Sequence, residues 1–411
     1  MMKKQVIAVV FGGRSVEHDV SILTGLQFLE ALDPTAFEAL PVYVDPLGQW
    51  WTGRALLARS NYPLAPTESA AQGLQKVTLD LTSATALGEA QLLIEEKSLF
   101  GTKTRSQKID LFVPAIHGSN GEDGTLQGLF DFAGVPYAGS RTLGAALTMD
   151  KWQSKRLAGA AGAPVLDALL VKKPKRGTFL DEAALMQDLT AQLGDSPFPV
   201  IVKPRTLGSS VGVSKVDSAD TLMAALLSAF QLDGFALIEP CVTPLVEYNI
   251  AVRRDSNGTV VTSAIEQPLS GGTLLDFHNK YRTGQKAGAP KAAGTSEGMA
   301  SLNRIINPEG LSTSKRAKIE ATAKQLFDLF DLAGSVRFDF LSQEDSDLLY
   351  FNEVNTVPGS FAYFLWEDAG APINFSLLTK AIVEEGLALS AEAVRQTGTD
   401  AGQAQLFKKS S

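Results

Sequence analysis

The sequence has few of the residues that form cross-links and metal centres. Its 411 residues include 1 cysteine, Cys241, which excludes an internal disulfide and is typical of a reducing compartment. The 3 histidines, His18, His117 and His278, lack the spacing of a metal site. Basic residues are the minority, since 37 Lys and Arg stand against 45 Asp and Glu for a net charge of -8. This balance argues against a broad nucleic-acid surface, although a local basic pocket can still bind an anion.

Long apolar runs are missing as well. The first residues imitate a signal peptide, but the apolar run at 5–11 is too short and ends at Gly12 and Gly13. No segment approaches the roughly 18 consecutive apolar residues that suggest a membrane span. We therefore expect a cytoplasmic protein that binds neither nucleic acid nor a membrane. The composition, 45% hydrophobic and 20% charged, is that of a globular chain long enough for two or three domains.

What is present is an alternation of strand and helix signals. Apolar runs at 6–11 and 109–116 predict buried parallel strands, each followed by a glycine-containing loop and a helical stretch. Strand, loop and helix repeated in this order predict an open α/β sheet as the first domain, over about residues 1–140. Within it, the polar segment 53–108 is expected to form surface excursions.

After this domain the pattern changes to hairpins. A strand at 199–204 precedes a loop of small residues, 208–212, which we call the glycine–serine loop, and a second strand follows. The loop matches the Gly-x-Ser-x-Gly string of a hydrolase nucleophile elbow, but the elbow requires a helix after it. It can instead cover phosphates with its backbone N–H groups and the hydroxyls of Ser209 and Ser210. An ordinary hairpin turn remains the alternative.

The hairpin around residues 336–355 carries the strongest chemical signal. Period-two alternation places Arg337 and Asp339 on one face, and the return strand is expected to present Phe351, Glu353 and Asn355 together. Two carboxylates and an amide oxygen then converge beside an arginine. Hard oxygen ligands without His or Cys suit Mg²⁺ that shares its shell with phosphate oxygens. The alternative is a solvated hairpin face with an Arg–carboxylate pair.

Three further residues are candidates by position. Lys203 ends an apolar strand beside the glycine–serine loop, and Lys151 begins a helical pattern, so both are plausible phosphate ligands or ordinary surface lysines. His117 follows a buried strand at its carboxyl end, where α/β sheets bind ligands. A structural histidine is the alternative there. Only the tail after about residue 391 is expected to be disordered.

Taken together, the segments resemble the D-alanine–D-alanine ligase family of ATP-grasp enzymes from about residue 6 to 380. The resembling motifs follow one another in family order at 11–21, 117–128, 136–140, 149–151, 202–204, 208–215, 280–281, 337–339 and 352–359. The resemblance implies an ATP-grasp fold behind an N-terminal Rossmann-like parallel-sheet domain. The implied parts are a substrate-binding domain at 1–140, a central subdomain at 141–238, a C-terminal subdomain with lid and metal site at 239–390, and a flexible tail at 391–411.

The resemblance also implies roles for single residues. The ATP site would comprise Lys151, Lys203, Ser210, Glu239 at the adenine, Glu247 at the ribose, and Lys280 in a lid. Two Mg²⁺ ions, or Mn²⁺ in their place, would be bound by Asp339, Glu353 and Asn355. The first amino acid's ammonium would be bound by Asp19, Ser209 and Tyr281. Its carboxylate would lie beside His117, and the reaction's oxyanion would be stabilised by Arg337 and the Gly359 N–H.

Three departures from the family pattern bear on the substrates. Asp19 stands where we expect a glutamate, and the lid is longer, with His278 before Lys280 and Tyr281. Phe364 stands where a serine commonly binds the second amino acid's carboxylate, which leaves only backbone N–H groups of Phe364 and Leu365 for that task. Lys280 and Tyr281 favour an amine acceptor over a hydroxyl acceptor.

The predicted function is an ATP-dependent ligase that joins two D-alanines through an acyl phosphate for peptidoglycan synthesis. The nearest alternative is a ligase of the same fold with a different acceptor. Two alternatives come from other functional classes. One is a hydrolase that uses Ser210 with His117 or His278, and the other is a non-catalytic nucleotide-binding module. The resemblance further suggests a homodimer.

Overall fold

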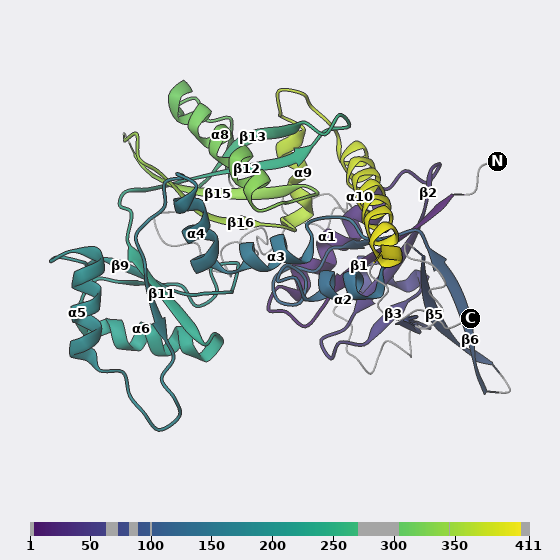
Figure 1. Cartoon of the computed structure of the whole chain (residues 1–411), viewed down its shortest axis with the longest axis horizontal. Coiled ribbons are helices and arrows are strands. Elements are labelled where there is room, and N and C mark those ends of the chain that lie inside the picture. Colours follow the sequence, from purple (N-terminus) through teal and green to yellow (C-terminus); the bar gives the residue numbers. More distant parts are fainter. Residues whose placement is uncertain are drawn as a thin grey trace, which may run out of the picture.

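The computed structural model describes residues 4–62, 73–81, 89–98, 101–269, 304–344 and 346–403. The described strands form three sheets of seven, four and five strands. Figure 1 shows the four-stranded sheet in a lobe of its own, the seven-stranded sheet at the other end, and the five-stranded sheet between and above them. No helix of the described part is long and apolar enough to cross a membrane.

The parallel core of the first sheet agrees with the prediction. Its strands are β1 (Gln5–Gly12), β2 (Phe37–Val44) and β7 (Leu111–Pro114), paired in parallel in the order β2-β1-β7. Alternate residues of β1 pack into two different cores. Val9 packs with residues of helix α1 (His18–Ala31), and Val10 packs with residues of helix α2 (Thr125–Ala133). Burial on both faces explains why β1 is an unbroken apolar run.

The segment 53–108 is not a set of surface excursions, contrary to our expectation. It begins with two short helices, η1 (Arg54–Leu57) and η2 (Arg59–Asn61). The chain then adds antiparallel strands to the sheet beyond β3 (Trp50–Thr52), namely β4 (Gln75–Leu79), β5 (Ala90–Ser98) and β6 (Gly101–Ile109). Strand β6 lies at the described edge of the sheet and is exposed along most of its length. Its polar composition suits an edge strand and hid the strand signal.

The second sheet contains the predicted hairpin. Its strands, in the order β10-β9-β11-β8, are β8 (Leu169–Lys172), β9 (Val200–Pro204), β10 (Ser214–Val216) and β11 (Phe235–Pro240). Strands β9 and β10 pair antiparallel across the glycine–serine loop. A strand rather than a helix follows this loop, so the nucleophile elbow is not formed. The helices of this region are α3 (Thr142–Met149), α4 (Lys151–Ala160), α5 (Glu182–Leu193) and α6 (Ala219–Leu232).

The third sheet carries the second predicted hairpin. In the order β14-β13-β12-β15-β16, its strands are β12 (Leu245–Arg254), β13 (Val260–Pro268), β14 (Arg304–Ile306), β15 (Val336–Gln343) and β16 (Leu349–Asn355). Val336, Phe338 and Phe340 are fully buried in one core with residues of helix α8 (Thr313–Leu329). The opposite face of β15 and β16 is therefore available for polar side chains.

The chain then returns to the first sheet. After the turn η5 (Gly359–Ala362) and the short helix α9 (Tyr363–Trp366), helix α10 (Phe375–Gln403) contacts α1 and β7. The tail predicted to be flexible from residue 391 is helical as far as Gln403, because it continues a helix whose first turns are anchored by buried Leu378, Ile382 and Val383. Residues 404–411 lie outside the described part.

Candidate active site

The β15–β16 hairpin brings the predicted metal ligands together. In its register Asp339 pairs with Glu353, and Arg337 pairs with Asn355. Directly paired residues share a face, so the predicted convergence of these four side chains is confirmed. Phe351 does not join them, contrary to our prediction. The register shifts between Asp339 and Phe340, and this bulge turns Phe351 into the core, where it is fully buried.

The oxygen atoms of this group suit a hard cation. The Asp339 carboxylate accepts two hydrogen bonds from Arg337, at 2.7 Å from Nε and 2.8 Å from Nη2, and a third from Asn355 Nδ2 at 3.1 Å. The described residues contain no cluster of three or more His, Cys, Asp or Glu side chains able to bind a metal. A Mg²⁺ ion here would take the carboxylates of Asp339 and Glu353 and the Asn355 amide oxygen, with phosphate and water completing its shell. The donor set fits that ion.

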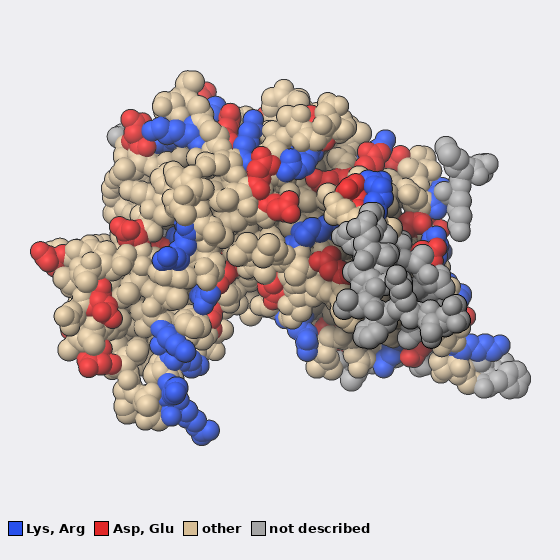
Figure 2. Space-filling view, in the orientation of Figure 1, with Lys and Arg blue, Asp and Glu red and all other residues tan. Residues whose placement is uncertain are grey.

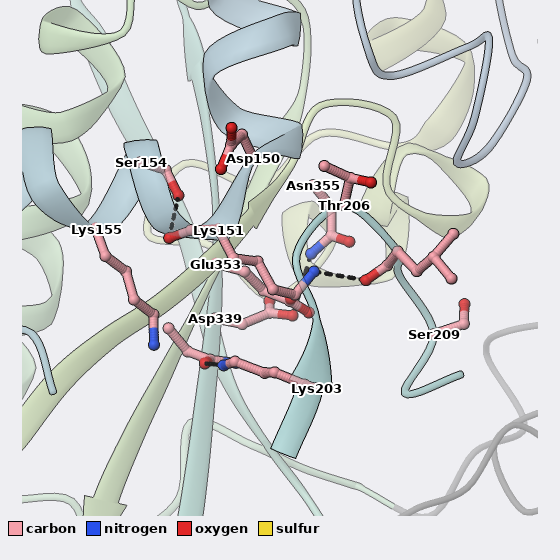
Figure 3. Close-up of polar contacts among 12 residues, drawn as sticks. Asp150, Lys151, Ser154, Lys155, Lys203, Thr206, Ser209, Asp339, Glu353 and Asn355 are labelled. Carbon is pink, nitrogen blue, oxygen red and sulfur yellow. Dashed lines mark hydrogen bonds and ion pairs between the residues drawn. The ribbon is translucent and has the colours of Figure 1, made fainter. Parts of the chain in front are cut away.

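Two lysines from other elements point at the same place. Lys151, at the start of α4, lies with its Nζ 3.1 Å from Glu353 Oε2 and 2.6 Å from the Leu207 carbonyl. Lys203, at the end of β9, lies 3.1 Å from the Asn352 side chain. Figure 3 shows the ammonium end of Lys151 beside Glu353, and Lys203 extending alongside Asp339. They are 7% and 6% exposed, so they are not solvated surface lysines.

Glu239 is the buried carboxylate that stabilises Lys203. It is 2% exposed on β11, and it pairs with Lys203 at 2.7 Å and also with Lys155 of α4. Burial alone would raise the pKa of Glu239, but the two ammonium groups outweigh it and hold that pKa below its usual range. Glu239 is therefore ionised and positions Lys203. No contact here tests its predicted place at the adenine, and the same is true of Glu247.

Glu17, and not Asp19, occupies the position that we assigned to Asp19. The Ser209 hydroxyl donates a hydrogen bond to Glu17 Oε1, and Glu17 is 7% exposed. A Cβ atom on Gly118 would lie 2.3 Å from Glu17 Oε2, so the absent side chain makes room for this carboxylate. Asp19 is exposed in the first turn of α1. Glu17 is the N-cap residue before α1, whereas Asp19 lies within its first turn, so the two carboxylates have different surroundings.

Glu122 is a site residue that the sequence reasoning missed. It is 8% exposed and accepts hydrogen bonds from the backbone N–H groups of Gly118 at 2.9 Å and Val357 at 2.8 Å. It thereby connects the loop after β7 to the loop after β16. Burial, and then the neighbouring Glu17, raise the pKa of Glu122 to about 7. Glu122 lies inside the motif 117–128, and this position was the sequence signal that could have identified it as a site residue.

His117 is buried beside the turn that follows the hairpin. Its Nε2 lies 2.7 Å from the Thr24 hydroxyl, which also accepts a hydrogen bond from the Ser360 N–H at 3.1 Å. Burial, with the positive charge of Arg337 adding to it, lowers the pKa of His117 to about 3. The ring is therefore neutral at physiological pH.

The turn at η5 has an unusual backbone. Ser360, Phe361 and Ala362 all have left-handed φ angles, of 54°, 52° and 54°. Three consecutive non-glycine residues in this region require tertiary contacts to stabilise them, and such strain clusters at functional sites. The turn presents Gly359 and leads directly into Phe364 and Leu365, which are 9% and 0% exposed. The predicted Lys280 and Tyr281, and also His278, lie outside the described residues.

Solved structures share the fold of this chain. The chain superposes on "Structure of the D-alanine-D-alanine ligase from Coxiella burnetii" with a TM-score of 0.75 at 22% identity, covering 98% of this chain and 99% of that one. "Crystal Structure of VanG D-Ala:D-Ser Ligase from Enterococcus faecalis" gives 0.71 at 24% identity, covering 93% and 100%. The chain therefore has the fold of these two structures, and within this fold two buried lysines face an Asp–Glu–Asn group.

Sequence comparison then identifies the family. Residues 6–140 match the family described as "D-ala D-ala ligase N-terminus", and residues 157–384 match "D-ala D-ala ligase C-terminus". The chain belongs to the D-alanine–D-alanine ligase family of ATP-dependent enzymes. A relative named D-alanine–D-alanine ligase from Geobacillus kaustophilus (strain HTA426) is 32% identical over 377 residues, 90% of this chain and 91% of the relative. One of the same name from Methylobacterium sp. (strain 4-46) is 34% identical over 395 residues, 94% and 93% of the two chains.

Proposed function

We propose that this enzyme joins two molecules of D-alanine, with conversion of ATP to ADP and phosphate, and so supplies the D-alanyl-D-alanine of peptidoglycan precursors. The observation that carries the proposal is the convergence of Lys151 and Lys203 on the Asp339–Glu353–Asn355 group. It occurs in a chain whose relatives, 32% and 34% identical, are named D-alanine–D-alanine ligases. Lysine charges and hard oxygen ligands together suit a bound triphosphate.

The first step in this proposal activates the donor. The donor's carboxylate attacks the γ-phosphorus of ATP, ADP leaves, and an acyl phosphate forms. Lys151 and Lys203 bind the phosphates, and the glycine–serine loop, with Ser210, covers them. Asp339, Glu353 and Asn355 would hold two Mg²⁺ ions, whose charge would neutralise that of the phosphate oxygens. In this proposal Glu239 lies at the adenine and Glu247 at the ribose, as the family resemblance implies.

The second step forms the amide. The acceptor's amine attacks the acyl carbonyl, and the tetrahedral intermediate expels phosphate while the nitrogen loses a proton. Arg337 and the Gly359 N–H stabilise the oxyanion, a preorganised electrostatic effect that usually contributes most to such catalysis. Glu17, assisted by Ser209, binds the donor's ammonium in place of Asp19. His117, neutral at physiological pH, lies by the donor's carboxylate.

The direct test is ADP release from the purified enzyme with Mg²⁺-ATP and D-alanine, with the product identified by mass spectrometry. The proposal expects D-alanyl-D-alanine, and none when ATP or Mg²⁺ is omitted. ADP release without dipeptide would refute the proposed acceptor while leaving donor activation intact. Absence of turnover with D-alanine would refute the proposed donor as well.

A second candidate is a ligase of the same fold with another acceptor. Phe364 at the position where the family resemblance implies a serine favours it, and one structural neighbour is named a D-Ala:D-Ser ligase. A panel of acceptors with D-alanine as donor decides between the two. ADP release far faster with another amino acid than with D-alanine alone would favour this candidate. The homodimer, the cytoplasmic location and the domain boundaries near residues 140, 238 and 390 remain predictions.

A further inference from the structure

A row of polar side chains crosses the third sheet on the face that carries the active site. Glu353 pairs with Asp339, Asp339 pairs with Asn249 of β12, and Asn249 pairs with Glu266 of β13. Directly paired residues on neighbouring strands lie on one face. Because strands are about 4.8 Å apart, Glu266 lies about 10 Å from Asp339, which is within the reach of one bound amino acid.

The far end of this row anchors an arginine. Glu266 is 4% exposed; its Oε1 accepts a hydrogen bond from Asn249 Nδ2 at 3.0 Å, and its Oε2 lies 2.9 Å from Arg304 Nη1. Arg304 is the first residue of β14 and is paired with Pro268. A buried carboxylate that is itself hydrogen-bonded fixes the guanidinium more firmly than a surface pair would.

Phe364 covers the same arginine from helix α9. The guanidinium carbon of Arg304 lies 3.9 Å from the centre of the Phe364 ring, and α9 packs on strands β12 and β13. A planar guanidinium stacks on an aromatic face, which fixes its plane. Phe364 thus replaces the expected serine hydroxyl with a ring that orients a cation.

Arg304 and Arg337 are held on the same row of side chains, because Glu266 pairs with Arg304 and Asp339 pairs with Arg337. Burial lowers the pKa of Arg304, Glu266 opposes that effect, and the charge of Arg337 lowers the pKa further. An arginine stays charged under such shifts, so two like charges that repel each other are held at Glu266 and Asp339, about 10 Å apart. An anionic group between them would relieve this repulsion. The carboxylate of an acceptor amino acid is such a group.

We infer that Arg304 binds the carboxylate of the acceptor, with Phe364 and Glu266 orienting its guanidinium. This inference rests on the proposed function and deepens it, because it restricts the acceptor to an amino acid with a free carboxylate. An amine that lacks this group is a poor acceptor. Arg304 takes over the task that the family resemblance gives to a serine at position 364.

The test is a competition between two acceptors in one reaction. D-alanine serves as donor, D-alanine and D-alaninamide compete as acceptors, and mass spectrometry gives the ratio of dipeptide to dipeptide amide. In the wild-type enzyme the dipeptide should predominate. Arg304→Met should lower the ratio about 10-fold to 100-fold, the usual effect of losing a hydrogen bond to a charged group. A ratio is independent of how much enzyme is folded and of any change in ATP binding.

Two variants sharpen the test. Arg253 stacks on Trp366 of the same helix at 4.9 Å, so Arg253→Met removes a similar contact and should leave the ratio unchanged. Adding Phe364→Ser to Arg304→Met restores a hydroxyl donor and should recover part of the ratio.

The outcomes separate this inference from the proposed function. If the wild type makes dipeptide but Arg304→Met loses both products in proportion, Arg304 is only structural and the inference is wrong. If the wild type makes no dipeptide, the proposed function fails, and the same ratio is measured with the best acceptor of the panel and its amide. A wild-type preference for the amide would overturn the inference in either case.

Discussion

Glu17 and Asp19 are two carboxylates of one motif with different surroundings. Glu17 is buried against Gly118 and accepts a hydrogen bond from Ser209, whereas Asp19 is exposed. If Glu17 binds the donor as proposed, the apparent replacement of glutamate by Asp19 is no longer a departure from the family pattern. Only Phe364, among the departures within the described residues, still bears on the substrates.

At the residue scale, this contrast predicts that substitutions of Glu17 and Asp19 have different effects on activity. Glu17→Gln should raise the KM for donor D-alanine and lower kcat/KM about 10-fold to 100-fold, because a charge-assisted contact to the ammonium is lost. Asp19→Asn should remain within about 2-fold of the wild type, since exposed substitutions usually have small effects. ADP release at varied D-alanine concentration measures both. Equal losses in the two variants would show that the assignment of Glu17 is wrong.

The β15–β16 hairpin predicts a loss of metal-dependent activity at the element scale. Asp339→Asn with Glu353→Gln removes both carboxylates while keeping their shapes, and ligation should fall at least about 100-fold because charge stabilisation is lost. Asp347→Asn with Glu344→Gln makes the same chemical changes at exposed positions near the turn of the same hairpin and should retain activity. Ligation rates over a Mg²⁺ titration check this. A wild-type rate in the first double variant would contradict the metal role.

Helix α10 carries a buried carboxylate that makes stability depend on pH. Burial raises the pKa of Glu385 to about 7, although Oε2 accepts a hydrogen bond from Gly334 N–H at 2.6 Å. Oε1 has no hydrogen-bond partner among the described residues. A raised carboxyl pKa means that the folded state binds more protons than the unfolded state. Stability should therefore fall as pH rises from about 4.5 to 7.

Glu385→Gln removes this titration. The variant should lose less free energy of unfolding than the wild type between pH 5 and pH 7.5, by on the order of 1–3 kcal/mol. Urea unfolding at the two pH values measures the difference. Parallel pH profiles for variant and wild type would show that Glu385 does not titrate in this range.

At the scale of the whole molecule, the active site lies where the three sheets meet. Glu122, in the loop after β7 of the first sheet, accepts a hydrogen bond from the Val357 N–H, which follows β16 of the third sheet. Lys151 and Lys203, which lie beside the second sheet and on it, contact residues of β16. Acidic and basic side chains are interspersed over the face shown in Figure 2, which has no broad basic field. This distribution suits a local anion site between elements rather than an extended nucleic-acid surface.

The connection through Glu122 predicts a coupled loss of stability and rate. Glu122→Ala leaves the N–H groups of Gly118 and Val357 without their acceptor, so the free energy of unfolding should fall by about 1–3 kcal/mol for each buried group. The rate constant kcat should fall more than the KM for ATP rises, because the loop bearing Gly359 is loosened. Asp123→Ala, whose carboxylate accepts hydrogen bonds only within its own loop from Asn120 and Thr125, is the control. Unfolding and steady-state kinetics of both variants test this; unaltered kcat in Glu122→Ala would argue against it.

The sequence alone determined the parts of this protein that depend on local patterns. Period-two alternation and apolar runs predicted the β1 strand, the β9–β10 hairpin and the common face of Arg337 and Asp339, because strand geometry follows from neighbouring residues. The ordered motifs predicted the family, which the comparisons confirmed. The positions of Lys151 and Lys203 were predicted as candidates, but their burial was not.

Only the tertiary structure decided the features that depend on contacts between distant segments. Ser209 and Glu17 lie 192 residues apart in the chain, and no local pattern shows which carboxylate of the motif meets this hydroxyl. The bulge that turns Phe351 away depends on the pairing of two strands. Arg304 becomes significant only when β14 and α9 bring it against Phe364. Such contacts depend on how helices begin and how sheets pack, which the spacing of residues does not specify.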